Sequence, residues 1–383
     1  MGGGRSPKKT PSTRRAKSAF GVSSSYAQKK TDRDVFVLRN LLFVQFGFGQ
    51  SNPTYQITDS AGTKYVVRKA PPGRLLSKTA HRVDREYRII SALGQTDVPV
   101  PKAYCLCEDV EVIGTAFYIM EFLDGRMVTE PHFPDCGPEE RLEMWRDAVR
   151  TLAKFHRVDI NKVGLSDFGR HGGFYDRQLK TFGTLSKTQA LVEDVDTKKP
   201  VGDIPHFEDM VAFFKQKSKQ PKDRSTLIHG DYKIDNLVFH KTEPRVIGIL
   251  DWEMATVGHP LSDFVNLTAP WVWTGRVSGS AHSSKGSDAF KAGATPGLPS
   301  LDQCIQWYAE MSGYDPRLEL AWGNAFGGFR GAIIMQGIAA RYARRQASGT
   351  TAKNYAEQMA PYGEWAYSLV KKLEDTLDGK AKL

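Results

Sequence analysis

The sequence predicts an α+β protein with two lobes, a small antiparallel-sheet lobe followed by a mainly helical lobe. Short β-like segments gather around one helical segment before residue 124, whereas helical periodicity dominates after it. A length of 383 residues also exceeds what one hydrophobic core usually organises. The predicted divisions are a disordered basic tail at 1–33, an N-terminal lobe at 34–124, a helical lobe at 125–377 and a flexible C-terminal tail at 378–383.

The N-terminal lobe is expected to begin in the apolar run at 35–48. Two strand-like segments follow, joined by a turn that contains Asp59 and Gly62. One helical pattern comes next and ends at Gly94. The predicted elements of this lobe are strands at 54–58, 64–69, 102–107 and 116–122 and a helix at 79–93.

The helical lobe repeats apolar residues at helical spacing, as Leu142, Trp145 and Val149 show. A segment at 275–299 is rich in Gly, Ser, Ala and Lys, which predicts a loop. The predicted helices lie at 139–157, 207–217, 301–311, 318–347 and 355–377.

Composition and charge narrow the class of protein. A hydrophobic content of 40% and a charged content of 25% are typical of a soluble globular chain. No apolar stretch approaches the roughly 20 residues that a membrane span needs, and no hydrophobic leader follows Met1. The net charge of +10 favours anionic partners such as nucleotides or coenzyme phosphates. Because no aromatic-and-basic motif accompanies the basic tail, we expect no nucleic-acid partner.

The cysteine pattern points to reduced thiols inside a cell. A disulfide framework needs more cysteines, at closer spacings, than this chain has. Zinc is also disfavoured, because the one C-x-C pair has no second cluster. The four cysteines are Cys105, Cys107, Cys136 and Cys304.

The segment at 227–267 carries the most informative chemistry. It contains two apolar strand candidates, at 237–239 and 246–250, joined by a polar turn. Antiparallel pairing places the start of the first strand beside the end of the second. Asn236 and Asp251 stand at these two ends. An amide oxygen and a carboxylate there are a plausible ligand set for Mg²⁺.

Asp231 lies five residues before Asn236, in a loop where Gly230 permits tight curvature. It can face the same pocket as the metal ligands without being one of them. Phosphoryl transfer needs a group that accepts or orients the hydroxyl proton, and ligands that fix the ions bridging the phosphates. The pattern therefore predicts a kinase in which Asp231 is the base.

The motif HGDYKIDN at 229–236, followed by DWE at 251–253, resembles the aminoglycoside phosphotransferase/choline kinase-like family. Within that family, the chain is most similar to the kinase domains linked to acyl-CoA dehydrogenases, over roughly residues 36–377. The resemblance implies a protein-kinase-like bilobal fold, ATP and Mg²⁺ as cofactors and an alcohol group as acceptor. It also implies that Asp231 is the catalytic base and that Asn236 and Asp251 bind magnesium.

The sequence departs from protein kinases, whose HRD and APE signatures are absent. A DFG tripeptide occurs at 167–169, but it precedes the catalytic loop and is interpreted as a coincidence. We therefore expect a small-molecule substrate rather than a protein.

The N-terminal lobe is expected to hold the nucleotide. Gly47, Gly49 and Ser51 precede a strand, where small residues let backbone N–H groups approach phosphates. Arg68 and Lys69 face opposite sides of the next strand, so only one can reach the nucleotide. The resemblance aligns Arg68 with the phosphate-pairing lysine of the family, and Lys69 remains an alternative.

Three further expectations complete the nucleotide site and its support. Glu86 is the expected partner of the phosphate-pairing cation. The resemblance implies a hinge at Met120, Glu121 and Phe122 whose backbone meets adenine. Asp263 either buttresses the catalytic loop, as the resemblance suggests, or caps a helix.

His229 and His156 are expected to be structural rather than catalytic, each orienting the segment that carries it. The substrate residues predicted are Arg330 and Arg341, which share one face of the helix expected at 318–347. Two arginines on one face can hold an anionic group such as a coenzyme phosphate. The alternative is that both pair with the protein's own acids.

The resemblance implies phosphorylation of a hydroxyacyl-CoA, a CoA thioester. Ala381-Lys382-Leu383 is a variant of the peroxisomal S-K-L signal, which predicts a peroxisomal location, with the cytoplasm as the alternative. Met1-Gly2 with Ser6 also fits the loose myristoylation pattern. The competing functions are a kinase of another small alcohol (an amino alcohol, a sugar or an aminoglycoside) and a non-catalytic nucleotide- or CoA-binding protein.

Overall fold

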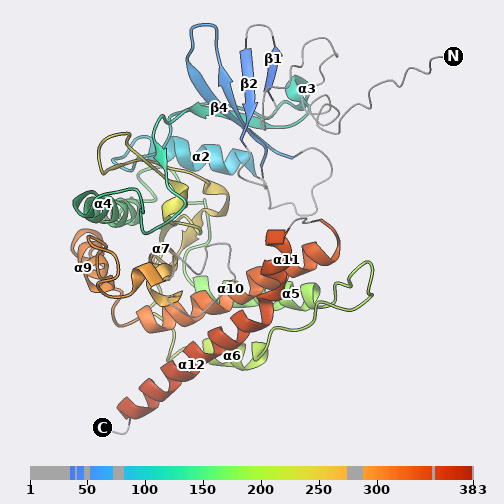
Figure 1. Ribbon diagram of the computed structural model, residues 1–383, viewed down its shortest axis with the longest axis vertical. Helices are drawn as coiled ribbons and strands as arrows, with labels where there is room; N and C mark the ends of the chain where they lie inside the picture. Colours follow the sequence, from blue (N-terminus) through green and yellow to red (C-terminus); the bar gives the residue numbers. More distant parts are fainter. Residues whose placement is uncertain are drawn as a thin grey trace, which may run out of the picture. The chain divides into compact units, whose positions relative to one another are not determined.

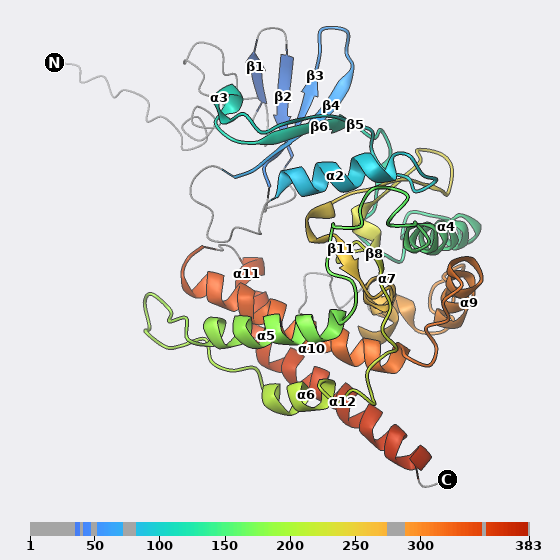
Figure 2. The ribbon, with the colours of Figure 1, turned by 180° about the vertical axis from the view of Figure 1, so that it is seen from behind.

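The computed structural model describes residues 35–38, 41–46, 52–71, 82–273, 288–346 and 350–381. Two compact units make up the chain (Figures 1 and 2). The first contains the residues through Gly125 together with Ile247–Met254, and the second contains Arg126–Val246 and the residues from Ala255 onward. The division after Gly125 lies one residue from the predicted boundary, but residues 247–254 group with the first unit although they come late in the sequence.

The first unit is built on a six-stranded sheet in the order β1-β2-β3-β4-β6-β5. Every neighbouring pair is antiparallel. The apolar run at 35–48 contains a hairpin that the sequence prediction did not resolve, with Val35 opposite Val44. The strands are β1 (Val35–Leu38), β2 (Leu41–Gln45), β3 (Thr54–Thr58), β4 (Lys64–Lys69), β5 (Ala103–Cys107) and β6 (Phe117–Glu121).

Two helices accompany this sheet in the described part of the unit, the longer α2 (Val83–Leu93) and the one-turn α3 (Val110–Ile113), both labelled in Figure 2. The longer helix packs against β5 and β6. Its buried side includes Ile89, Ile90 and Leu93, and it also carries Glu86 inward. The predicted start at residue 79 lies outside the described residues. Burial of these apolar side chains stabilises the packing of the helix at roughly 25 cal/mol for each Å² removed from water.

Residues 247–254 are in close contact with residues of the first unit that are distant in the sequence. The amide of Ile249 donates to the carbonyl of Pro99 at 3.0 Å. Gly248 lies so close to Leu123 that an added β-carbon would overlap the Leu123 side chain. The strand β10 (Val246–Ile249) thus begins in the second unit and ends in the first, and Asp251 lies two residues after its end.

The second unit is mainly helical, with short strands beside the catalytic motif. β7 (Arg126–Met127) pairs with β9 (Leu237–Phe239), and β8 (Thr226–Ile228) pairs with β11 (Thr256–Gly258). The turn after β9 is closed by a hydrogen bond from the His240 amide to the Arg245 carbonyl at 2.8 Å. Its principal helices are α4 (Pro138–His156), α5 (Phe174–Ala190), α6 (Phe207–Phe214), α7 (Leu261–Trp273), α9 (Leu301–Ser312), α10 (Leu320–Ala343), α11 (Thr350–Glu357) and α12 (Met359–Ala381).

The core of the second unit is aromatic. Phe326 of α10 stacks on Trp322 with ring centroids 5.1 Å apart, and Tyr175 of α5 meets Phe326 edge-on at 4.9 Å. The sequence analysis missed α5, because Thr, Ser and Gly between 181 and 188 weaken its helical signal. Packing of its apolar face against α10 stabilises the helix instead, since tertiary burial overrides intrinsic propensity.

The remaining differences from prediction concern helix ends. The single helix predicted at 355–377 is two helices, α11 and α12, and α12 lies beside α10 (Figures 1 and 2). Of the loop predicted at 275–299, residues 288–299 are described and contain one short 3₁₀ turn at Asp288–Phe290. All four cysteines are free thiols. Within the described ranges, no helix has both the length and the apolar character that a bilayer crossing requires.

Gly297 fixes the start of α4. Its φ of +80° lies in the left-handed region, and an added β-carbon would overlap the backbone of Pro138, the first residue of α4. The neighbouring carbonyl of Pro296 accepts a hydrogen bond from Arg141, a buried residue of the same helix. This backbone-to-backbone approach leaves no room for a side chain.

We therefore predict that Gly297→Ala lowers the free energy of unfolding by about 1–3 kcal/mol more than Gly293→Ala does. Gly293 is the matched control, because its φ of +76° imposes the same backbone strain while open space surrounds it. Urea denaturation followed by circular dichroism measures both. Equal losses from the two substitutions would show that Pro138 can move aside.

Candidate active site

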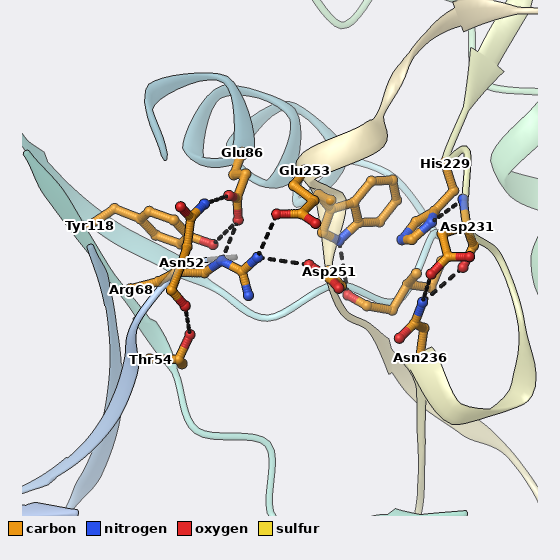
Figure 3. Close-up of polar contacts among 12 residues, drawn as sticks. Asn52, Thr54, Arg68, Glu86, Tyr118, His229, Asp231, Asn236, Asp251 and Glu253 are labelled. Atoms are coloured by element: carbon orange, nitrogen blue, oxygen red, sulfur yellow. Dashed lines mark hydrogen bonds and ion pairs between the residues drawn. The ribbon is translucent and has the colours of Figure 1, made fainter. Parts of the chain in front are cut away.

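Asp231 stands between β8 and a 3₁₀ turn at Ile234–Asn236, both in the second unit. The amide nitrogen of Asn236 donates to the Asp231 main-chain oxygen at 2.8 Å and to its carboxylate oxygen Oδ2 at 3.0 Å (Figure 3). Because this Nδ2 is committed to Asp231, the side-chain oxygen of Asn236 is the atom available to a cation. Asp231 and Asn236, both selected by the sequence analysis, are thus in direct contact.

Asn266 is a second amide beside Asp231 that the sequence analysis missed. It lies on α7, and its Nδ2 is 3.4 Å from Asp231 Oδ1 and 3.1 Å from the Tyr232 carbonyl oxygen. The two carboxylate oxygens of Asp231 therefore each face an amide donor. A signal existed in the sequence, because Asn266 follows Asp263 by three residues and so shares its helix face.

Lys233 is a cation in the same loop that the sequence analysis did not select. Its ammonium lies 3.5 Å from Asp231 Oδ2 and 3.2 Å from Asp235 Oδ2. Burial by itself lowers the pKa of Lys233, but the two carboxylates outweigh it and raise the pKa above its usual value. Positive charge therefore stays beside Asp231 at neutral pH.

Asp263 holds the main chain of the loop. Its fully buried carboxylate accepts the amide of His229 at 2.6 Å and the amide of Gly230 at 2.8 Å. His156 Nε2 lies 3.2 Å from the same carboxylate, and His156 Nδ1 lies 2.6 Å from the Tyr308 hydroxyl. Of the two roles considered for Asp263, the geometry supports the one in which it buttresses the loop that carries Asp231.

Charge explains how this carboxylate remains ionised. Burial by itself raises the pKa of Asp263, but the hydrogen bond and charge of His156, with the charge of His229, outweigh it and lower the pKa. His229 and His156 are both buried and both contact groups of the loop or its support. This agrees with the structural role expected for the two histidines.

The two predicted substrate arginines differ in their surroundings. Arg330 of α10 is half-buried and donates from Nη2 to the Gly230 carbonyl oxygen at 2.6 Å. Arg341, on the same helix, is exposed. Among the described residues neither arginine forms an ion pair with an acid, so the self-pairing alternative has no support. A substrate contact by either residue stays a prediction.

In the first unit, Arg68 of β4 joins three carboxylates. Its Nε lies 2.7 Å from Glu86 Oε2, and its Nη2 lies 2.7 Å from Asp251 Oδ1 and 3.6 Å from Glu253 (Figure 3). Burial by itself lowers the pKa of Arg68, but the charge of Glu86 and its neighbours raises it above its usual value. The planar fork of a guanidinium allows this bridging, which a single ammonium nitrogen would not reproduce.

Glu86 is held by two further donors that the sequence analysis missed. Asn52 donates to Oε1 at 2.6 Å, and the Tyr118 hydroxyl donates to Oε2 at 3.0 Å. Burial raises the pKa of Glu86 to about 7, and Arg68, Tyr118 and Asn52 oppose this rise. Asn52 and Tyr118 carry no recognisable motif, because their partner lies more than thirty residues away in the sequence.

Lys69 was the alternative to Arg68. Its side chain is almost fully buried, and burial lowers its pKa. The cation that pairs with Glu86 is Arg68. Gly47, Gly49 and Ser51 lie outside the described residues.

The expected hinge forms the end of β6 and the residue after it. Met120 is buried in the strand. The Glu121 amide donates to the Lys102 carbonyl at 2.8 Å, and the Glu121 carboxylate accepts the Lys102 amide at 3.0 Å. Lys64 lies 5.1 Å from the centre of the Phe122 ring. A contact of this segment with adenine stays a prediction.

The chain is similar to known proteins over most of its length. Residues 43–299 match the phosphotransferase enzyme family. A putative aminoglycoside phosphotransferase from Ralstonia eutropha is 33% identical, with a TM-score of 0.72, and the match covers 88% of this chain and 94% of that one.

Two curated relatives are longer. A probable acyl-CoA dehydrogenase, IBR3, of Arabidopsis thaliana is 38% identical over 82% of this chain, and acyl-CoA dehydrogenase family member 11 of Gallus gallus is 35% identical over 86%. The chain spans only 38% and 40% of the length of these two relatives. Together with the kinase-like fold, these matches confirm the resemblance read from the HGDYKIDN motif. The chain belongs to the phosphotransferase enzyme family.

Proposed function

We propose that this protein transfers the γ-phosphoryl group of Mg·ATP to a hydroxyl group of a small molecule. The observation that carries the proposal is the setting of Asp231, whose two carboxylate oxygens face the amide donors of Asn236 and Asn266. Such a carboxylate can accept or orient the proton of an attacking hydroxyl, which is the role of the base in phosphoryl transfer. Lys233 supplies positive charge next to it.

The resemblance of the HGDYKIDN and DWE motifs implies magnesium ligands at Asn236 and Asp251, and both residues carry oxygen donors. Mg²⁺ usually binds one or two protein oxygens and completes its shell with water and substrate phosphates. Asn236 offers its side-chain oxygen, and Asp251 offers a carboxylate. Among the described residues, no group of three or more His, Cys, Asp or Glu side chains forms a metal site. We propose that Asn236 and Asp251 would hold the magnesium ion that accompanies ATP, where it would neutralise phosphate charge.

The proposed contact of the first unit with ATP phosphates is the cation Arg68. Arg68 is fixed by Glu86, and Glu86 is fixed in turn by Asn52 and Tyr118. A cation positioned before ligand arrives can pair with phosphate oxygens at low entropic cost. Membership of the phosphotransferase family supports the same nucleotide.

We propose a hydroxyacyl-CoA as the acceptor. The support comes from two curated relatives, both named as acyl-CoA dehydrogenases, and from the exposed cation Arg341 on α10. A second candidate is another small alcohol, favoured by the name of the Ralstonia protein, a putative aminoglycoside phosphotransferase. The non-catalytic alternative is disfavoured by the intact Asp231, Asn236 and Asp251.

A peroxisomal location remains a proposal based on the sequence Ala381-Lys382-Leu383. Lys382 and Leu383 lie outside the described residues, as does the myristoylation pattern that starts at Met1.

Asp231→Asn should reduce kcat by about 10²-fold or more, the usual scale for a positioned base, while nucleotide affinity stays within a few-fold of wild type. The substitution preserves shape but replaces an acceptor oxygen with a donor that faces the amides of Asn236 and Asn266. Asp235→Asn is the control, because it also removes a partner of Lys233 from the same loop. Steady-state kinetics with ATP decides this, and a kcat within a few-fold of wild type would remove Asp231 from the mechanism.

Asp251→Asn should weaken Mg²⁺-dependent ATP binding by about 10-fold or more, because a charged oxygen ligand is lost. Asparagine is the informative substitution here. Asp251 has a φ of +65°, which asparagine tolerates and alanine does not, so Asp251→Ala would add backbone strain. Isothermal calorimetry with and without magnesium measures the effect. Unchanged Mg·ATP affinity would place the metal elsewhere.

A hydroxyacyl-CoA should be phosphorylated with a kcat/KM about 10-fold or more above that of the same hydroxy acid without CoA. One charge-assisted contact to a CoA phosphate is worth about 1.5–3 kcal/mol, and binding energy remote from the reacting hydroxyl also aligns it. Arg341→Ala should narrow this gap by lowering only the CoA value. Equal kcat/KM for the two acceptors would discard the CoA assignment and leave the kinase assignment standing.

A further inference from the structure

The peptide bond between Gly230 and Asp231 is held at both of its polar atoms. The carbonyl oxygen of Gly230 accepts a hydrogen bond from Arg330 Nη2 at 2.6 Å. The amide of Asp231 donates to His229 Nδ1 at 3.2 Å. The C=O and N–H groups belong to one rigid peptide plane, so the two contacts together restrict its rotation.

The preceding residues are held as well, again through the main chain. Asp263 accepts the amides of His229 and Gly230 at 2.6 and 2.8 Å. Four main-chain groups in three consecutive residues are therefore paired with Arg330, His229 or Asp263. Each of these contacts is to the backbone of the loop, so together they set the direction in which the Asp231 side chain leaves the chain.

This backbone needs external restraint. Gly230 has a φ of +82° and, without a β-carbon, moves between positive and negative φ at little cost. A rotation there would swing the Asp231 carboxylate away from Asn236 and Asn266. A displacement of about 1 Å at a reacting group can cost about 10²-fold in rate. Arg330 therefore contacts Gly230, the residue of the loop whose backbone rotates most easily.

We propose that Arg330 is a positioning residue for Asp231, acting through the carbonyl oxygen of Gly230 rather than through a substrate. This inference rests on the proposed kinase function. Arg330 comes from α10, 100 residues beyond the loop, and its half-buried guanidinium faces a buried residue. A charged donor to a carbonyl forms a stronger hydrogen bond than a neutral one. The proposal also separates Arg330 from Arg341, which is exposed on the same helix.

The kinetic test compares Arg330→Met, Arg330→Lys and Arg344→Met. Arg344 directly follows α10 and is exposed, so it serves as the matched control. We expect Arg330→Met to lower kcat by about 10- to 100-fold, with the KM for ATP unchanged. The loss should be the same for a hydroxyacyl-CoA and for its free hydroxy acid, since the substrate is not the partner. Arg330→Lys, which can still donate one hydrogen bond, should recover part of the loss.

A second measurement does not depend on activity. Hydrogen–deuterium exchange of a peptide that spans residues 229–231 should be about 10-fold faster in Arg330→Met, whereas a peptide from α12 exchanges as in wild type. If the wild-type enzyme phosphorylates no acceptor, the kinase proposal fails while the exchange result still decides the role of Arg330.

Two outcomes overturn the proposal. The first is unchanged exchange of this peptide in both Arg330 variants. The second is a higher KM for the hydroxyacyl-CoA with an unchanged kcat, which would make Arg330 a substrate contact. If Arg330→Met fails to fold, Arg330→Lys carries both measurements.

Discussion

A single buried carboxylate, that of Asp263, is the constraint on which the conformation of the loop at 229–231 depends. An ionised group removed from water is costly unless several donors surround it. Asp263 meets this requirement with two main-chain amides of the loop and with His156. If the loop left this conformation, the buried Asp263 carboxylate would lose its two main-chain donors. Formation of the active loop and satisfaction of the carboxylate are therefore the same event.

His156 extends this constraint into the helical core. It lies at the end of α4, and its second ring nitrogen contacts the Tyr308 hydroxyl of α9. Burial raises the pKa of Tyr308 above its ordinary range, so the hydroxyl remains protonated and can donate. The chain of contacts from α9 through His156 to Asp263 connects the packing of two helices with the position of Asp231. Rigidity at the loop thus has its source in the core.

In the first unit, the cation Arg68 stabilises another buried carboxylate, that of Glu86. Glu86 is buried, and its charge is favoured by an ion pair with Arg68 and by hydrogen bonds that Tyr118 and Asn52 donate to it. Arg68 satisfies Glu86 with one nitrogen and reaches Asp251 with another. Arg68 creates a connection between two carboxylates that a lysine would not provide.

Local patterns in the sequence were sufficient for the strands that alternate in polarity, for the long helices and for the contact between Asp231 and Asn236, which are five residues apart. They were not sufficient for α5, whose helical state depends on α10, or for the hairpin in the apolar run before residue 46. Asn52 was missed, and Arg330 was predicted as a substrate residue rather than as a donor to Gly230, because their partners lie 34 and 100 residues away in the sequence. Asn266 was missed although it follows Asp263 by three residues on the same helix face.

The contacts of Asp263 and Arg330 with the main chain of the loop have a consequence for divergence within the family. Within the loop, Asp263 and Arg330 contact only main-chain atoms of residues 229 and 230. These contacts do not depend on loop side chains, although the φ of +82° favours glycine at 230. A half-buried position nearby, such as Asp235, can therefore mutate without loss of these main-chain contacts. Substitution of side chains near the loop can change which acceptor is preferred, while the main-chain conformation of the loop stays the same. A scaffold of this kind can acquire new substrates while its reaction is conserved.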